Sequence, residues 1–79
     1  MTLESIGFSV PVRVTGFSGL TEIDQTRLDG LGLRLGVTVT KILKTPLQDP
    51  IECLVGTQLL AIEARLLPRV RVESVRRGR

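Results

Sequence analysis

The chain has 79 residues, of which 42% are apolar and 24% are charged, and its net charge is +3. This composition is typical of one small globular domain with a single modest core, and it excludes a chain that is disordered throughout. There is no His, Trp or Tyr, and there is one Cys, so most side chains used for catalysis or metal binding are absent.

The positive charge is concentrated at the carboxyl terminus. Three of the eleven basic residues lie within residues 76–79, and the other eight balance the eight acidic residues, so that residues 1–75 are neutral. We therefore expect a folded domain at 1–75 and a basic disordered tail at 76–79. A neutral fold with two Phe residues lacks the basic stripe and aromatic platforms of a nucleic-acid binder.

The first element in chain order is a strand. Val10, Val12 and Val14 alternate with Pro11 and with polar residues, which predicts a half-buried strand that Pro11 confines to its start or to an edge. Residues 16–19, with two glycines, predict a turn after it.

A short helix is predicted over residues 21–31. Thr21 is suited to accept a hydrogen bond from the amide of Asp24, and Gly30 or Gly32 would end the helix. The apolar residues that fall roughly on one face are Leu20, Ile23, Leu28 and Leu31.

Four more strand-like segments follow, at 36–44, 51–55, 58–64 and 70–73. The apolar pattern of the first segment changes phase at residues 41–42, which predicts a bulge or a bend, and the alternation places Lys41 outward. Two prolines in 46–50 predict a stiff loop, Gly56-Thr57 predicts a hairpin link, and 65–68 predicts one helical turn. Five short strands and one helix predict a mainly β fold, a small SH3-like antiparallel five-stranded barrel that closes on itself.

A set of motifs within this pattern resembles the FeoA family. The segments that carry the resemblance are Arg27-Leu28, Leu31-Gly32-Leu33, Gly36 with Val39, Pro46–Ile51, Gly56 with Leu60-Ala61-Ile62, and Val70–Glu73. They span about Val10 to Glu73, and Gln48 departs from the Gly that is common in the family. The resemblance implies an SH3-like domain and a link to ferrous iron transport and iron homeostasis.

Neither catalysis nor resident metal binding is favoured by the residues themselves. General acid–base chemistry near neutral pH usually uses His or a perturbed carboxylate, and the carboxylates here are scattered. Cys53 alternates with Ile51 and Val55, so we expect it in the core, not as a nucleophile. A structural zinc site needs four Cys or His ligands. We predict no enzyme, cofactor or metal ligands; a weak transition-metal site on the surface, or one shared between subunits, stays open.

The remaining class is a module for protein–protein interaction. A barrel this thin is not expected to enclose all its leucines, and exposed apolar groups often mark a partner site. The expected contact residues are Leu47 and Asp49 in the proline loop and Leu66 and Leu67 in the late helical turn, with Leu54 facing opposite Cys53. The open alternative is that the helix, or a second copy of the chain, covers these leucines.

The FeoA resemblance implies a cytoplasmic, non-catalytic accessory protein of bacterial ferrous iron uptake. Its expected partner is the cytoplasmic GTP-binding domain of a membrane ferrous iron transporter, without membrane insertion or nucleic-acid binding. A possible homo-oligomer is compatible with this. The alternative is a stand-alone interaction module related to the C-terminal domain of metal-dependent transcriptional repressors.

Overall fold

A computed structural model describes residues 1–44, 46 and 48–75, in the predicted order of one strand, one helix and four further strands. The elements in chain order are β1 Val12–Phe17, α1 Glu22–Gly30, β2 Thr38–Lys44, β3 Ile51–Val55, β4 Gln58–Ile62, the 3-10 helix η1 Ala64–Arg69 and β5 Val70–Ser74. The first strand begins directly after Pro11 and runs through Phe17, so the turn expected at 16–19 starts later than predicted. Leu47 and the basic tail predicted at 76–79 lie outside the described residues.

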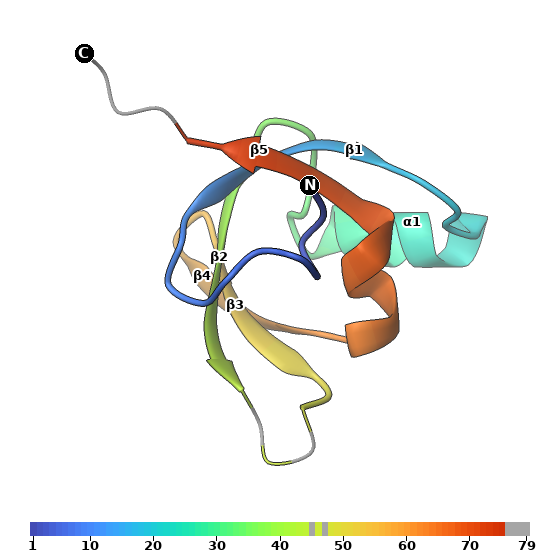
Figure 1. Ribbon diagram of the computed structural model, residues 1–79. Helices are drawn as coiled ribbons and strands as arrows, with labels where there is room; N and C mark the ends of the chain where they lie inside the picture. Colours follow the sequence, from blue (N-terminus) through green and yellow to red (C-terminus); the bar gives the residue numbers. More distant parts are fainter. Residues whose placement is uncertain (45, 47, 76–79) are drawn as a thin grey trace.

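The five strands form one antiparallel sheet in the order β4-β3-β2-β1-β5 (Figure 1). This confirms the mainly β class with one short helix. The prediction of a closed barrel is wrong, because β4 and β5 are the two edges of the sheet and do not pair with each other. The six residues of η1 carry the chain from one edge to the other instead.

The core lies inside the curled sheet and is almost entirely aliphatic. Every strand contributes to it through alternate residues, as half-buried strands do, and Cys53 is fully buried, as predicted. Its members are Leu3, Val12, Val14, Leu28, Leu33, Val39, Ile51, Cys53, Val55, Ile62, Leu66, Leu67, Val70 and Val72.

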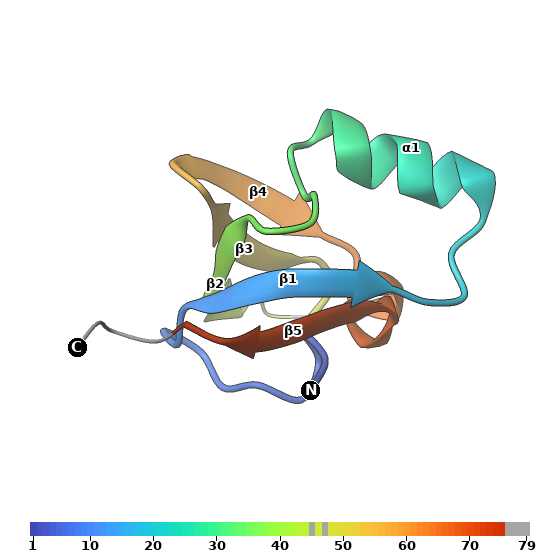
Figure 2. The same cartoon turned by 90° about the horizontal axis from the view of Figure 1, so that it is seen from above.

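Helix α1 lies at one end of the sheet, beyond the ends of β1 and β4 (Figure 2). The Asp24 amide donates to Thr21 Oγ1 at 3.1 Å, which confirms the predicted cap. The chain leaves the helix through Gly32, whose φ of +91° favours glycine. Leu28 is buried, but Ile23 is 74% exposed. The predicted apolar face is therefore wrong at Ile23, because α1 packs on the core mainly through Leu28 and the adjoining loop.

The bulge predicted in the second strand is confirmed, since the register between β2 and β3 shifts between Lys41 and Leu43. Lys41 itself is buried, in contrast to the outward position expected for it. It follows Val39 by two residues and so shares the inner face. Its Nζ donates to the carbonyl of Glu4 at 3.3 Å and lies 5.0 Å from the centre of the Phe8 ring.

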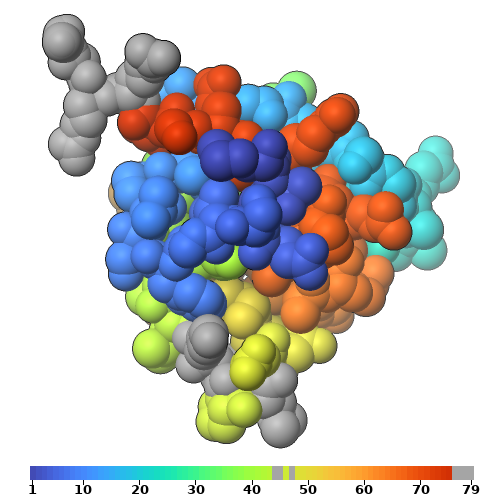
Figure 3. Space-filling view, in the orientation of Figure 1, coloured from blue at the N-terminus to red at the C-terminus, as the bar shows by residue number. Residues whose placement is uncertain are grey.

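The amino-terminal segment covers the β5 edge. Thr2 forms an antiparallel bridge with Arg71, and the Leu3 amide donates to the Val70 carbonyl at 2.8 Å. The Val72 amide donates to the Met1 carbonyl at 2.9 Å. In the space-filling view this segment, in dark blue, spreads over the front of the molecule below the red atoms of β5 (Figure 3). The edge at β5 is thus occupied by the chain's own first residues.

Candidate partner-binding site

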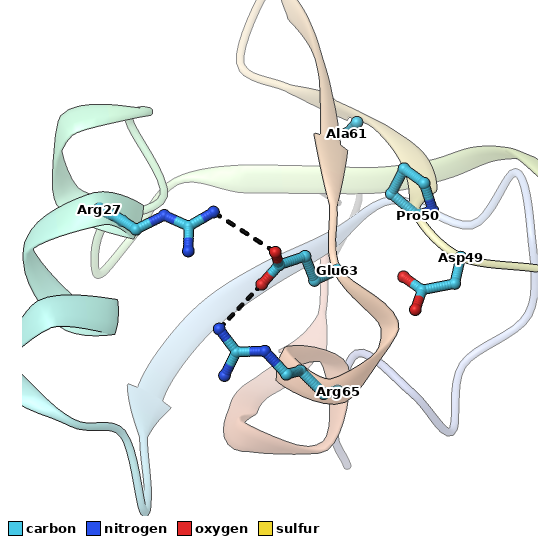
Figure 4. Close-up of a pocket in the computed structure, with 6 residues that line it drawn as sticks. All are labelled: Arg27, Asp49, Pro50, Ala61, Glu63 and Arg65. Carbon is cyan, nitrogen blue, oxygen red and sulfur yellow. Dashed lines mark ion pairs between the residues drawn. The ribbon is translucent and has the colours of Figure 1, made fainter.

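A network of ion pairs, with charges of alternating sign, joins α1 to the segment that follows β4. Arg65, in η1, donates from Nη1 to Oδ2 and from Nη2 to Oδ1 of Asp24, each at 3.0 Å. Glu63 stands between two cations: its Oε1 lies 2.9 Å from Arg65 Nη2, and its Oε2 lies 3.5 Å from Arg27 Nη2 (Figure 4). Four side chains from two segments thereby neutralise one another across the boundary between helix and sheet.

Within this network of ion pairs, the Asp24 side chain is the most shielded from water. The Asp24 side chain is 11% exposed, whereas that of Arg65 is 57% exposed. Hydrogen bonds from Arg65 hold the pKa of the Asp24 carboxyl below its ordinary value, against the opposing effect of desolvation. The same hydrogen bonds raise the pKa of the Arg65 guanidinium. Both groups are therefore charged at neutral pH, and the pair fixes α1 against η1.

Asp49 contributes a third connection from the proline loop. Its Oδ1 accepts a hydrogen bond from the Ala64 amide at 2.9 Å, and Ala64 is the first residue of η1. The loop, the end of β4 and α1 together surround an open depression of about 480 Å³. Its lining consists of Arg27, Asp49, Pro50, Ala61, Glu63 and Arg65 (Figure 4). The depression combines small apolar surfaces with balanced charges of both signs, as in the polar rim of a protein interface.

The structure corrects part of the predicted contact surface. Leu66 and Leu67 are only 3% and 6% exposed, so the expectation that the fold could not enclose them is wrong. Their 3-10 turn lies across the open end of the curled sheet, where both side chains join the core. Asp49 lies on the depression, Leu47 lies outside the described residues, and Leu54 is exposed as predicted.

Other leucines are exposed that the sequence interpretation did not single out. Leu59 on β4 is 60% exposed, Leu43 on β2 is 58% exposed, and Leu35 lies exposed in the loop after α1. Leu59 pairs with Leu54 across the β3–β4 hairpin. The Gly56-Thr57 hairpin link was recognised in the sequence, and counting outward from it would have placed Leu59 on the outer face beside Leu54.

The thiol of Cys53 lies fully inside the core. Burial raises the pKa of the Cys53 thiol to about 11, which keeps it protonated and unreactive at neutral pH. Within residues 1–44, 46 and 48–75 no three His, Cys, Asp or Glu side chains are grouped so that they could hold a metal ion. Over the same residues, no helix has the length and apolar character needed to cross a bilayer.

A curled antiparallel sheet of five short strands, with a helix after β1 and a 3-10 turn before β5, defines an SH3-like domain with charged and apolar surface. Within that class, the chain belongs to the FeoA family: residues 1–74 match the FeoA domain. A search of curated proteins finds no match.

Solved structures support the same assignment. The chain is similar to iron(II) transport protein A from Clostridium thermocellum, with 28% identity and a TM-score of 0.82, covering 95% of this chain and 46% of that one. FeoA from Chlorobium tepidum has 25% identity and a TM-score of 0.86, covering 96% and 71%. FeoA from Stenotrophomonas maltophilia, solved with zinc, has 28% identity and a TM-score of 0.75, covering 92% and 89%. The chain thus spans less than half of the Clostridium thermocellum chain.

Proposed function

We propose that this protein is a non-catalytic accessory protein of bacterial ferrous iron uptake. The observation that carries the proposal is the FeoA match over residues 1–74, together with relatives described as an iron(II) transport protein and as a possible ferrous iron transport activating factor. The enclosed position of Cys53 and the paired state of Asp24 suit a protein that acts by contact.

We further propose that the partner is the cytoplasmic GTP-binding domain of the iron transporter, which places the protein in the cytoplasm. The proposed contact surface is the depression around Asp49 and Glu63, together with Leu47, which precedes Asp49 by two residues in the sequence. Arg27 lies at its rim, with a side chain that is 53% exposed. Rim charges of this kind set the rate and the specificity of association more than its strength.

Calorimetric titration of the full chain into the isolated GTP-binding domain, with and without guanine nucleotide, tests the proposal. We expect binding in at least one nucleotide state, several-fold weaker for Arg27→Glu and for Leu47→Asp. The matched control is Arg13→Glu, because Arg13 is also half-exposed and paired with a glutamate, Glu73 at 3.3 Å, but lies on β1 away from the depression.

Three outcomes would contradict the proposal: absence of binding in every nucleotide state, equal losses for Arg27→Glu and Arg13→Glu, or a lysate pull-down that recovers a DNA-binding protein and no transporter. The last outcome would favour the repressor-related module.

A further inference from the structure

We propose that strand β4 pairs with β4 of a second copy of this chain, antiparallel and about a two-fold axis, so that two five-stranded sheets become one. The two edges of the sheet differ in whether another segment pairs with them. β5 is covered by residues Met1 to Leu3. β4 has β3 on one side and, among the described residues, no strand on the other. Figure 2 shows β4 on the opposite side of the molecule from β5 and the amino terminus.

The peptide groups of β4 are regularly arranged for such pairing. Gly56, with φ of +61°, and Thr57 form a two-residue link, after which β3 and β4 pair without a bulge from Val55–Gln58 to Ile51–Ile62. The residue pair that closes a two-residue hairpin is hydrogen-bonded. Along an antiparallel ladder, hydrogen-bonded pairs alternate with pairs whose N–H and C=O groups point away from the partner strand. The N–H and C=O groups of Leu59 and Ala61 therefore point away from β3, toward the free edge.

The side chains of β4 carry none of the features that usually protect an edge. Natural proteins protect exposed edges with charges, prolines or bulges, whereas Gln58–Ile62 has no charged residue, no proline and a regular register. Leu59 is exposed, and its cross-strand neighbour Leu54 is exposed beside it. The edge thus combines unpaired peptide groups with an apolar outer face.

The partner that best fits the free edge of β4 is a second copy of the same strand. A two-fold antiparallel arrangement centred on Leu59 makes the same peptide groups donate and accept, and it places Leu54 and Leu59 in one row with their two copies. An isologous contact of this kind needs only one self-complementary surface. A two-fold contact sets each side chain of β4 near its own copy, and because β4 carries no charge, no like charges meet when two copies pair.

The expected association is weak and reversible. A single strand pair with one row of leucines belongs to the small end of protein interfaces, below about 1,200 Å², for which we expect a dissociation constant between about 1 µM and about 1 mM. Sedimentation equilibrium of the full chain over that concentration range should show the mass rising from 8.7 kDa toward twice that value.

The matched variants are Leu59→Lys and Leu43→Lys. Both leucines are exposed to nearly the same extent, 60% and 58%, on the outer face of the same sheet, but only Leu59 lies on the edge strand. We expect Leu59→Lys to remain monomeric at every concentration and Leu43→Lys to associate like the original chain. A monomer throughout for the original chain, or unchanged association of Leu59→Lys, would overturn the proposal.

Amide hydrogen exchange distinguishes this contact from any other dimer. The amide of Leu59 should exchange at least several-fold more slowly as the concentration rises, while that of the exposed loop residue Leu35 should not change. Protection that rises with concentration elsewhere but not at Leu59 would assign the dimer to another face and refute the pairing of β4. The transporter takes no part in these measurements, so their result is independent of the proposed function.

Discussion

Arg65 and Asp24, 41 residues apart in the sequence, form a two-point ion pair in which two guanidinium nitrogens each donate to one carboxylate oxygen at 3.0 Å. The contact joins η1 to α1 and uses the planar geometry in which arginine recognises a carboxylate. Helix α1 has one residue, Leu28, in the aliphatic core. The ion pair therefore gives the helix a second point of attachment beside Leu28.

The first prediction concerns the pH dependence of this pair. The pKa of Asp24 is lower in the folded chain than its ordinary value of 3.8. Folding therefore favours the ionised form, and the stabilisation is complete above the ordinary value and is lost as the pH falls through the folded pKa. Asp24→Asn should lower the melting temperature by a few degrees at neutral pH, and this difference should shrink as the pH falls below the ordinary pKa of an aspartate and the carboxyl becomes protonated.

Thermal melts of both proteins across the acid range check this. Asp29→Asn is the control, because Asp29 is an exposed aspartate on the same helix whose contact with Arg34 is 3.9 Å. A difference between the original chain and Asp24→Asn that stayed constant down to low pH would contradict the role given to the ion pair.

The second prediction compares two leucines separated by one residue. Leu33 is fully buried and Leu35 is 66% exposed. Leu33→Ala leaves a cavity in the core and should lower the free energy of unfolding by about 2–5 kcal/mol. Leu35→Ala should change it by less than about 0.5 kcal/mol. Urea unfolding measures both, and similar losses for the two variants would show that the core boundary is misplaced.

The third prediction is that replacing Gly30 or Gly32 by alanine changes the stability of the fold in opposite directions. A Cβ at Gly30 or at Gly32 would meet no atom within 4 Å, so backbone conformation alone decides the outcome. Gly32 has φ of +91°, and Gly32→Ala should cost about 1–2 kcal/mol. Gly30 ends α1 and has no such conformation, so Gly30→Ala should stabilise by about 0.5–1 kcal/mol. Chemical unfolding of both variants tests the signs, and a gain for Gly32→Ala would refute this account of the helix end.

The fourth prediction concerns the thiol. Because burial raises the pKa of Cys53 to about 11, its reaction with a disulfide reagent at neutral pH should be at least about 100-fold slower than that of a free cysteine. Unfolding the chain in guanidinium should restore the ordinary rate. A Leu43→Cys variant supplies an exposed thiol on the adjacent strand as an internal reference. Fast reaction of Cys53 in the folded chain would be evidence against its place in the core.

The local signals in the sequence predicted the elements well. The Thr21 cap, the bulge after Lys41 and the Gly56-Thr57 link each depend on neighbouring residues, so they were predictable without knowing the rest of the fold. The same is true of Cys53, whose alternation with Ile51 and Val55 placed it inward.

What the sequence did not predict depends on contacts between distant segments. Leu66 and Leu67 are buried because η1 lies across the open end of the sheet. The sequence around these two leucines does not indicate where η1 lies in the fold. Ile23 is exposed because α1 packs on the core mainly through Leu28 and the adjoining loop. The network of ion pairs through Arg65 joins residues from two separate segments. Sequence patterns among neighbouring residues do not show that these segments meet.

The cover that Thr2 and Leu3 provide for β5 also limits how copies can join. With β5 covered, a strand pair through β4 stops at two molecules. A version of the chain that starts after Leu3 would uncover a second, different edge and remove a leucine from the core. Each molecule could then add another at both ends, and the product would be an open-ended fibre.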